Sequence, residues 1–302
     1  MNIINTALNQ FARACDVTIP DYFNRRFKTG KEDLDCVFGS SGIVPNFTFT
    51  LAAAPGTGKT TFLLQTLELL ELAGKHTAYI SGEETVEQLA YTSNRIGVRN
   101  VPLANLTDID DICELIVLHK FNFVVIDSLP AITSKKRMNK RQLEEYITTK
   151  LIKTAKQNEI VIGTILHFTK NGTYKGGTLY PHSCDCNIVM TRNVEDLNLR
   201  DIEVTKNRFG NSSQTIFEMT SNGFTFNAVD IENIEQNKSS NKKQTKQDIV
   251  LNTLNIPKTI EQIACESRVS GIYLSTLLRQ LVNEGKIVKE GRGSNATFVI
   301  KS

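Results

Sequence analysis

One loop constrains the fold of this chain more than any other segment. It reads Ala53-Ala54-Pro55-Gly56-Thr57-Gly58-Lys59-Thr60-Thr61, and it stands between a short apolar run and a leucine-rich stretch. A glycine-rich turn that joins a strand to a helix and ends in Gly-Lys-Thr is a Walker A loop, whose backbone amides surround phosphate oxygens. The sequence therefore predicts a strand, a phosphate-binding loop and a helix at this point.

The residue types in the loop match what phosphate binding requires. Gly56 and Gly58 let the backbone approach phosphate oxygens closely, Lys59 supplies a charge for the β and γ phosphates, and Thr60 offers a hydroxyl to Mg²⁺. The usual leading glycine is replaced by Ala53, which is tolerable if its φ is negative. ATP and Mg²⁺ are thus the expected cofactors. The expected nucleotide contacts in the loop are Ala54, Pro55, Gly56, Thr57, Gly58, Lys59, Thr60 and Thr61.

Two further apolar runs end in carboxylates. Asp127 closes the run 123–126 and is predicted to lie beside the Mg²⁺ as a Walker B residue; the alternative is an aspartate that caps a helix. Glu83 and Glu84 follow the run 77–80, and we expect Glu83 to be the base that orients and deprotonates the attacking water. The alternative is that both glutamates only favour the start of a helix over 85–95.

Short apolar runs alternate with longer helical patterns from about residue 47 to residue 190, which predicts an α/β fold with a mainly parallel sheet. A hairpin over 201–206 and 214–219 is expected to extend this sheet in antiparallel fashion. The five predicted parallel strands cover residues 47–51, 77–80, 123–126, 160–165 and 187–190.

The chain is predicted to divide into four parts. An N-terminal helical segment over 1–27, with Ile4, Leu8, Phe11 and Ala12 on one face, would contact a neighbouring subunit. An ATPase core over 28–229 is followed by a polar linker over 230–246, which cannot bury enough apolar surface to fold. Residues 247–302 read as three helices and a hairpin, the order of a winged helix-turn-helix.

Composition and hydrophobic patterning indicate the cellular compartment and the class of partner. The sequence contains no apolar run of about 18 residues and no secretory signal pattern, so we expect a cytoplasmic protein without a membrane partner. The six cysteines are scattered, and the close pair Cys184 and Cys186 has no second pair to complete a zinc site. A formal net charge of +3 does not by itself imply nucleic acid.

Several motifs together resemble the ATPase core of the bacterial RadA (Sms) recombination proteins, which are related to the DnaB-type helicases. The resemblance runs from about residue 29 to residue 227, about two thirds of the chain. Its most specific string is Lys206-Asn207-Arg208-Phe209-Gly210. The other matching segments are the Walker pair, Gly82-Glu83-Glu84, His167-Phe168-Thr169-Lys170-Asn171-Gly172, Leu34-Asp35-Cys36-Val37-Phe38-Gly39 and Gly42-Ile43-Val44-Pro45.

This resemblance implies a RecA-like core that assembles as a hexameric ring with ATP between neighbours. Lys206 and Arg208 would then reach the γ-phosphate of the adjacent subunit, and His167 and Thr169 would sense the γ-phosphate within their own subunit. Without the resemblance, a hairpin turn with two solvated cations is the better interpretation of Lys206 and Arg208.

Two basic segments stand where RecA-like folds place DNA-contacting loops. They contain the predicted single-stranded-DNA contacts Lys135, Lys136, Arg137, Lys140, Arg141, Lys170 and Lys175. Cations on such loops give sequence-tolerant phosphate binding. The alternative is a solvated charge run at the start of a helix.

The sequence departs from the RadA pattern at both ends, because neither the four-cysteine zinc module nor the Lon-protease-like domain is found. The C-terminal winged helix would bind DNA or a protein partner. We therefore predict an ATP hydrolase that acts as a single-stranded-DNA motor in recombination, repair or replication, with helicase activity as a possible extension. The alternatives are a nucleotide-dependent assembly switch or loader that recruits protein partners, and a DNA-binding regulator whose ATPase core only sets the oligomeric state.

Overall fold

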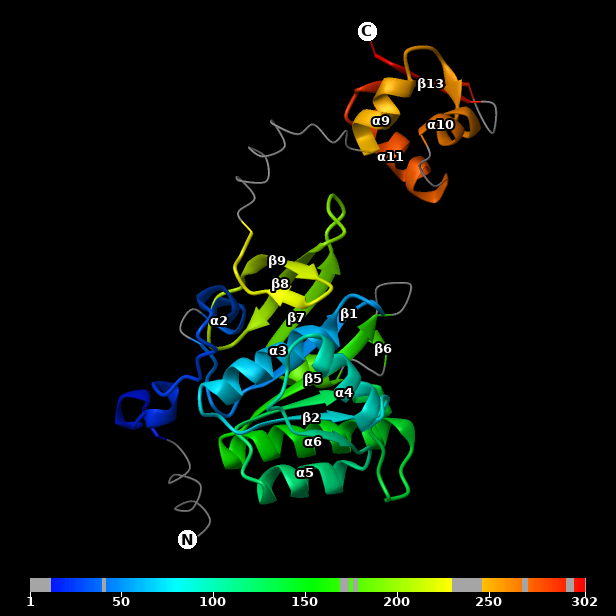
Figure 1. Ribbon diagram of the computed structural model, residues 1–302. Coiled ribbons are helices and arrows are strands. Elements are labelled where there is room, and N and C mark those ends of the chain that lie inside the picture. The colour runs from blue at the N-terminus through cyan, green and yellow to red at the C-terminus, as the bar shows by residue number, and fades with distance from the viewer. Residues whose placement is uncertain are drawn as a thin grey trace. The chain divides into compact units, whose positions relative to one another are not determined.

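The computed structural model describes residues 12–39, 42–168, 174–175, 179–229, 246–267, 271–291 and 296–301. The chain forms two compact units, Met1–Asp230 and Ile231–Ser302 (Figure 1), and each has a hydrophobic core of its own. The four parts expected from the sequence, with their boundaries, stay a prediction. The predicted linker over 230–246 lies outside the described residues except for its last residue.

The first unit is built on a ten-stranded sheet with the order β10-β9-β8-β7-β1-β5-β4-β2-β3, and β6 pairs with β5 outside this path. The strands from β7 to β3 in that order are parallel, whereas β8, β9, β10 and β6 pair in antiparallel fashion. The strands are β1 (Thr48–Ala53), β2 (Thr77–Ser81), β3 (Leu103–Asn105), β4 (Phe123–Asp127), β5 (Val161–Phe168), β6 (Tyr174–Lys175), β7 (Cys186–Arg192), β8 (Leu199–Asn207), β9 (Gln214–Thr220) and β10 (Gly223–Thr225).

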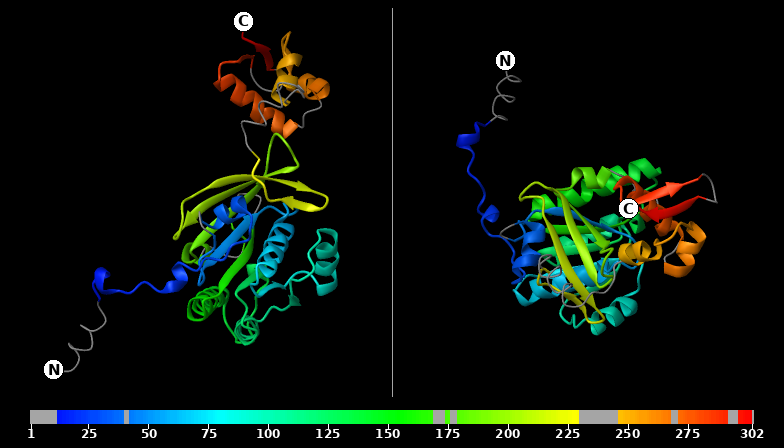
Figure 2. Two further views of the ribbon diagram at one scale, coloured as in Figure 1. Left: turned by 60° about the vertical axis from the view of Figure 1, so that its left-hand side comes forward. Right: turned by 90° about the horizontal axis from the view of Figure 1, so that it is seen from above.

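Helices cover both faces of this sheet (Figure 2), which explains why the parallel strands read as continuous apolar runs. Within β4, Phe123 and Val125 join one core, and Val124 and Ile126 join the other. The first core takes residues from α2 (Glu32–Phe38), α3 (Lys59–Leu72) and α4 (Val86–Arg95), and the second from α5 (Ile109–Leu118), α6 (Lys140–Asn158) and α7 (Leu179–Ser183). The predicted α/β fold with a mainly parallel sheet is confirmed.

Side-chain caps set the starts of three of these helices. Thr85 and Gln88 form a capping box at α4, Asn139 and Gln142 form one at α6, and the Asp108 carboxylate accepts two backbone N–H bonds at α5. The side-chain cap of α4 is thus Thr85, and the choice between a catalytic Glu83 and a favourable charge at the helix start stays open. The remaining helical turns are the 3₁₀ elements η1 (Ala14–Asp16), η2 (Asp21–Phe23) and η3 (Leu129–Ala131).

Only part of the N-terminal prediction can be compared with the structure. Ile4, Leu8 and Phe11 lie outside the described residues, so the amphipathic helix over 1–27 stays a prediction. Ala12 is exposed and non-helical, and the described residues 12–23 contain only the short η1 and η2.

The second unit contains α9 (Lys246–Thr253), α10 (Ile260–Ser267), α11 (Gly271–Asn283) and the sheet β11-β13-β12. Its strands are β11 (Lys258–Thr259), β12 (Ile287–Glu290) and β13 (Thr297–Ile300), and all pairs are antiparallel. Leu274, Leu278 and Leu281 of α11 pack in the core of this unit. Three helices and a hairpin therefore lie where the sequence predicts them, and their assignment as a winged helix stays a prediction. Among the residues with described positions, no helix is long and apolar enough to cross a bilayer.

Candidate nucleotide-binding site

The Walker A segment forms a tight loop between β1 and α3. Gly56 has φ 70° and Gly58 has φ 108°, conformations that side chains other than glycine rarely adopt. A Cβ on Gly58 would also lie 2.6 Å from the Met219 sulfur. Ala53 is a buried residue of β1 and has no positive φ. An alanine is therefore tolerated in place of the usual leading glycine. The backbone of the predicted loop thus depends on the two glycines that remain.

Lys59 lies inside this loop. Its ammonium donates to the Ala53 carbonyl at 3.3 Å and to the Ala54 carbonyl at 3.1 Å. Burial lowers the pKa of Lys59, and the nearby Asp127 and Glu83 carboxylates oppose that shift. The charge that would meet β and γ phosphates is therefore held at the loop and faces two acidic residues.

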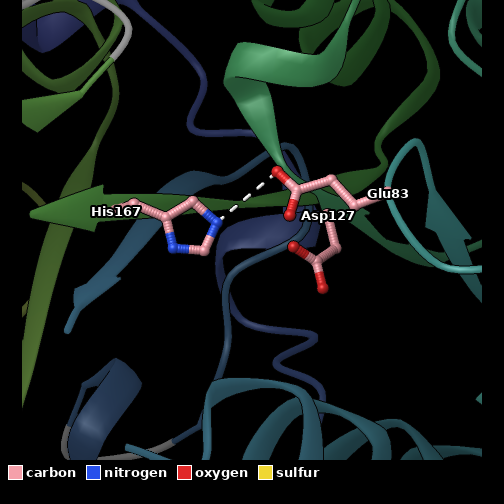
Figure 3. Close-up of side chains that lie close together, drawn as sticks. All are labelled: Glu83, Asp127 and His167. Carbon is pink, nitrogen blue, oxygen red and sulfur yellow. Dashed lines mark ion pairs between the residues drawn. The ribbon is translucent and has the colours of Figure 1, made fainter. Parts of the chain in front are cut away.

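Three side chains from neighbouring strands meet at the same edge of the sheet. Glu83 follows β2, Asp127 ends β4 and His167 lies near the end of β5, and their ligand atoms all lie within 4.8 Å of one another (Figure 3). The His167 Nε2 atom is 3.5 Å from the Glu83 Oε1 atom. The Ser128 hydroxyl donates to the same oxygen of Glu83. The structure thus brings together the predicted base, the predicted metal ligand and one predicted γ-phosphate sensor.

Asp127 makes contacts that a helix cap would not make. Its Oδ2 atom accepts a hydrogen bond of 2.6 Å from the Tyr79 hydroxyl and one of 3.5 Å from the Thr60 hydroxyl. Burial raises the pKa of Asp127, the Tyr79 hydrogen bond lowers it, and the charge of Glu83 raises it again. Thr60 and Asp127 offer adjacent oxygen atoms, the ligand type that Mg²⁺ prefers, so the residues present fit the ion.

Lys206 and Arg208 lie at the opposite end of the central strands. The Lys206 ammonium donates to the His182 and Cys184 carbonyls at 2.8 and 2.6 Å. Arg208 lies 3.3 Å from the buried Asp185 carboxylate, which also accepts from the backbone and hydroxyl of Thr48 at the start of β1. The Walker A loop follows the other end of β1, about 20 Å away for a strand of this length. These two cations therefore lie far from the phosphate loop of their own chain.

The predicted DNA contacts are partly paired with acids. Lys135 bonds Asp111 at 2.6 Å, and Arg141 bonds Glu145 at 3.0 Å. Lys136 lies 3.0 Å from Asp110 and packs over the Tyr146 ring. Arg137 and Lys140 are exposed. Thr169 and Lys170 lie outside the described residues, and for Lys175 the structure describes only the backbone, in β6.

Two arginines that sequence reasoning missed hold the Walker A loop from the other side. Arg192 donates to the Gly56 carbonyl and the buried Arg200 donates to the Thr57 carbonyl, both at 2.7 Å. Burial lowers the pKa of Arg200, and the charge of Arg192 adds to this shift. A signal existed in the sequence, because alternation along β8 places Arg200 on the same face as Ile202 and Val204.

The sheet order and the loop at the end of its central strand define a P-loop protein of the RecA-like fold. A solved ATPase domain matches with a TM-score of 0.58 at 15% identity, over 74% of this chain and 96% of that domain. A KaiC-like protein from Pyrococcus horikoshii matches with a TM-score of 0.56 at 20% identity, over 68% of this chain and 99% of that one. At these identities the likeness concerns the fold.

Among curated proteins, the chain is similar to the DNA repair protein RadA. It is 32% identical to the Salmonella typhimurium protein over 211 residues and 31% identical to the Escherichia coli protein over 208 residues. Each match covers 66% of this chain and 44% of the relative, so the chain spans less than half the length of these proteins. No protein-family model matches the chain. The similarity to RadA inferred from motifs is thereby confirmed over about two thirds of the chain.

Proposed function

We propose that this chain is a Mg²⁺-dependent ATP hydrolase that acts as a RadA-like motor on single-stranded DNA in recombination, repair or replication. The observation that carries the proposal is the convergence of Lys59, Thr60, Glu83 and Asp127 at one edge of a RecA-like sheet. The similarity to a DNA repair protein supports the biological setting.

Each residue at this edge has a distinct part in the proposed reaction. Lys59 would neutralise charge on the β and γ phosphates, and Thr60 and Asp127 would hold Mg²⁺, which would offset further phosphate charge. Glu83 accepts a proton from the attacking water and orients it. His167 lies beside Glu83 and would contact the γ-phosphate, so it can report whether that phosphate is present.

We infer that Lys206 and Arg208 complete the site of a neighbouring copy in a ring, which we propose to be hexameric. The Arg208 side chain is 48% exposed although its partner Asp185 is buried, so it remains accessible to another subunit. A cation at the γ-phosphate neutralises charge that develops in the transition state.

DNA binding is proposed for the segment around the start of α6. Arg137 and Lys140 are exposed there, and Lys135 and Lys136 have mostly exposed side chains. In the second unit, the order of helices and strands supports a winged helix, and this unit would bind DNA or a protein partner.

Steady-state ATP hydrolysis with and without single-stranded DNA, at two salt concentrations, tests the proposal. We expect stimulation by DNA that weakens with salt, and background hydrolysis for Lys59→Ala. Lys156→Ala, at an exposed lysine of α6, is the matched control and should behave as wild type. Hydrolysis in Lys59→Ala equal to wild type would contradict the proposed active site.

A nucleotide-dependent assembly switch is the second candidate. It is favoured by the pairing of Lys135, Lys136 and Arg141 with carboxylates of their own chain, which reduces the charge offered to DNA. Hydrolysis that depends on Lys59 but does not respond to DNA would support this candidate and contradict the motor. The next experiment would then be a search for a protein partner of the second unit.

A further inference from the structure

We propose that Tyr79 is a positioning residue that orients the Asp127 carboxylate for Mg²⁺. This inference rests on the proposed function, because it concerns the metal of the same site. It assigns to a strand tyrosine a role that neither the Walker motifs nor the RadA-like strings specify.

The sheet register places the two residues for this contact. β2 and β4 are neighbouring parallel strands in which Tyr79 pairs with Val125, and Asp127 lies two residues further along β4. Side chains two apart in a strand lie on the same face. The long Tyr79 side chain therefore runs toward the carboxyl end of the sheet, and its hydroxyl reaches the Asp127 Oδ2 atom at 2.6 Å.

The hydrogen bond between Tyr79 and Asp127 is buried. The Tyr79 side chain is fully buried and Asp127 is 6% exposed, so water has little access to the contact. A buried carboxylate without a partner is costly, and the terminal torsion of an aspartate is broad. One donor fixed by the packing of β2 therefore selects one orientation of the carboxylate.

The two oxygens of the Asp127 carboxylate differ in their hydrogen-bond partners. Oδ2 accepts from Tyr79 and, at 3.5 Å, from Thr60. Within the described residues, Oδ1 accepts no hydrogen bond from a side chain or the backbone. Tyr79 thereby occupies one oxygen and leaves the other for the ion or its water. Groups that orient metal ligands in this way are typically worth about 10- to 100-fold in metal affinity.

The competing explanation is that Tyr79 only fills the core, since its ring belongs to the main hydrophobic cluster. Tyr79→Phe keeps the ring and removes the hydroxyl, so it separates the two explanations. Tyr180→Phe is the matched control, because Tyr180 is equally buried in the same unit and its hydroxyl bonds none of the site's carboxylates.

The test is the binding of a fluorescent, non-hydrolysable ATP analogue to the full chain, titrated with Mg²⁺ and repeated in EDTA. For Tyr79→Phe we expect wild-type affinity in EDTA and a Mg²⁺ concentration for half-maximal binding about 10-fold above wild type. Tyr180→Phe should match wild type in both. A melting temperature in EDTA close to that of Tyr180→Phe would show that Tyr79→Phe is folded.

Three outcomes contradict the inference, and they can be told apart. If the wild-type chain responds to Mg²⁺ and Tyr79→Phe gives the same curve, Tyr79 is a packing residue and the proposed function is untouched. If Tyr79→Phe and Tyr180→Phe shift alike, the effect is one of general stability. If the wild-type chain binds no nucleotide, the proposed function fails and this inference fails with it.

Discussion

The two ends of β1 hold charge in opposite ways. At its carboxyl end, the Lys59 ammonium donates to the Ala53 and Ala54 carbonyls and lies near the Glu83 and Asp127 carboxylates. At its amino end, the buried Asp185 binds Thr48 and pairs with Arg208. The charged groups at the carboxyl end would be available to a ligand, whereas Asp185 and Arg208 at the amino end pair with each other. Arg192 and Arg200 contact the phosphate loop of their own chain, whereas Arg208 is paired at the opposite end of β1.

Replacing Arg208 tests this difference most strongly. If Arg208 serves a neighbouring site, Arg208→Ala should lower ATP turnover about 10³-fold and leave nucleotide affinity nearly unchanged. Turnover and the affinity for a fluorescent ATP analogue are the two measurements. Arg99→Ala, at another exposed arginine, should affect neither. Equal losses of affinity and turnover would indicate a structural role at Asp185.

Mixing two inactive variants asks whether the active site is shared. Lys59→Ala chains keep Arg208, and Arg208→Ala chains keep Lys59, so a site at their interface can contain both wild-type residues. A mixture assembled in equal amounts should regain a substantial fraction of the wild-type rate. A rate that equals the sum of the separate variants would show that each site lies within one chain.

Replacing Glu83 separates the two adjacent glutamates at the carboxyl end. Glu83→Gln should reduce turnover about 10²-fold because the base is lost, whereas Mg²⁺-dependent nucleotide binding is retained. Glu84→Gln is the matched control and should have a smaller effect. Burial, followed by the charges of Asp127 and Glu83, raises the pKa of Glu84. The reverse order of effects in single-turnover assays would assign the base to Glu84.

The smallest expected effect concerns the ion pairs near the start of α6. Asp110→Asn with Asp111→Asn should release Lys135 and Lys136 and tighten binding to single-stranded DNA about 2- to 5-fold, because exposed ion pairs are weak. Fluorescence anisotropy with a labelled oligonucleotide at low salt measures this change. Glu114→Gln, at an exposed position of the same helix, is the control. An unchanged affinity would show that these lysines do not bind DNA.

The sequence predicted those parts of the molecule that depend on local patterns. Continuous apolar runs such as 123–126 indicated strands buried on both faces, and these strands were confirmed with ends shifted by a few residues. The strands β3 and β10 were missed because three residues are too few to show a pattern. The meeting of Glu83 and Asp127 is explained by the parallel pairing of β2 and β4, which end at one edge of the sheet.

Contacts between distant segments were not predictable in the same way. Tyr79 looked like one more aromatic residue of a strand, because nothing in its own segment shows that Asp127 lies within reach of its hydroxyl. Lys135 and Lys136 looked unpaired in the sequence because Asp110 and Asp111 lie far before them in the chain. The packing of α5 against α6 brings these acids close to the two lysines.

Strand β8 runs between the two ends of the central sheet. Arg200, near its start, binds the phosphate loop of its own chain, and Lys206, near its end, belongs to the group proposed to serve the next chain. The strand pairs with β7 from Arg200 to Asn207 and with β9 from Leu199 to Glu203. If the proposed ring forms, a displacement of β8 at the phosphate loop of one chain would also move Lys206, which is proposed to serve the neighbouring ATP. This one strand would then couple ATP hydrolysis in one subunit to the site of the next.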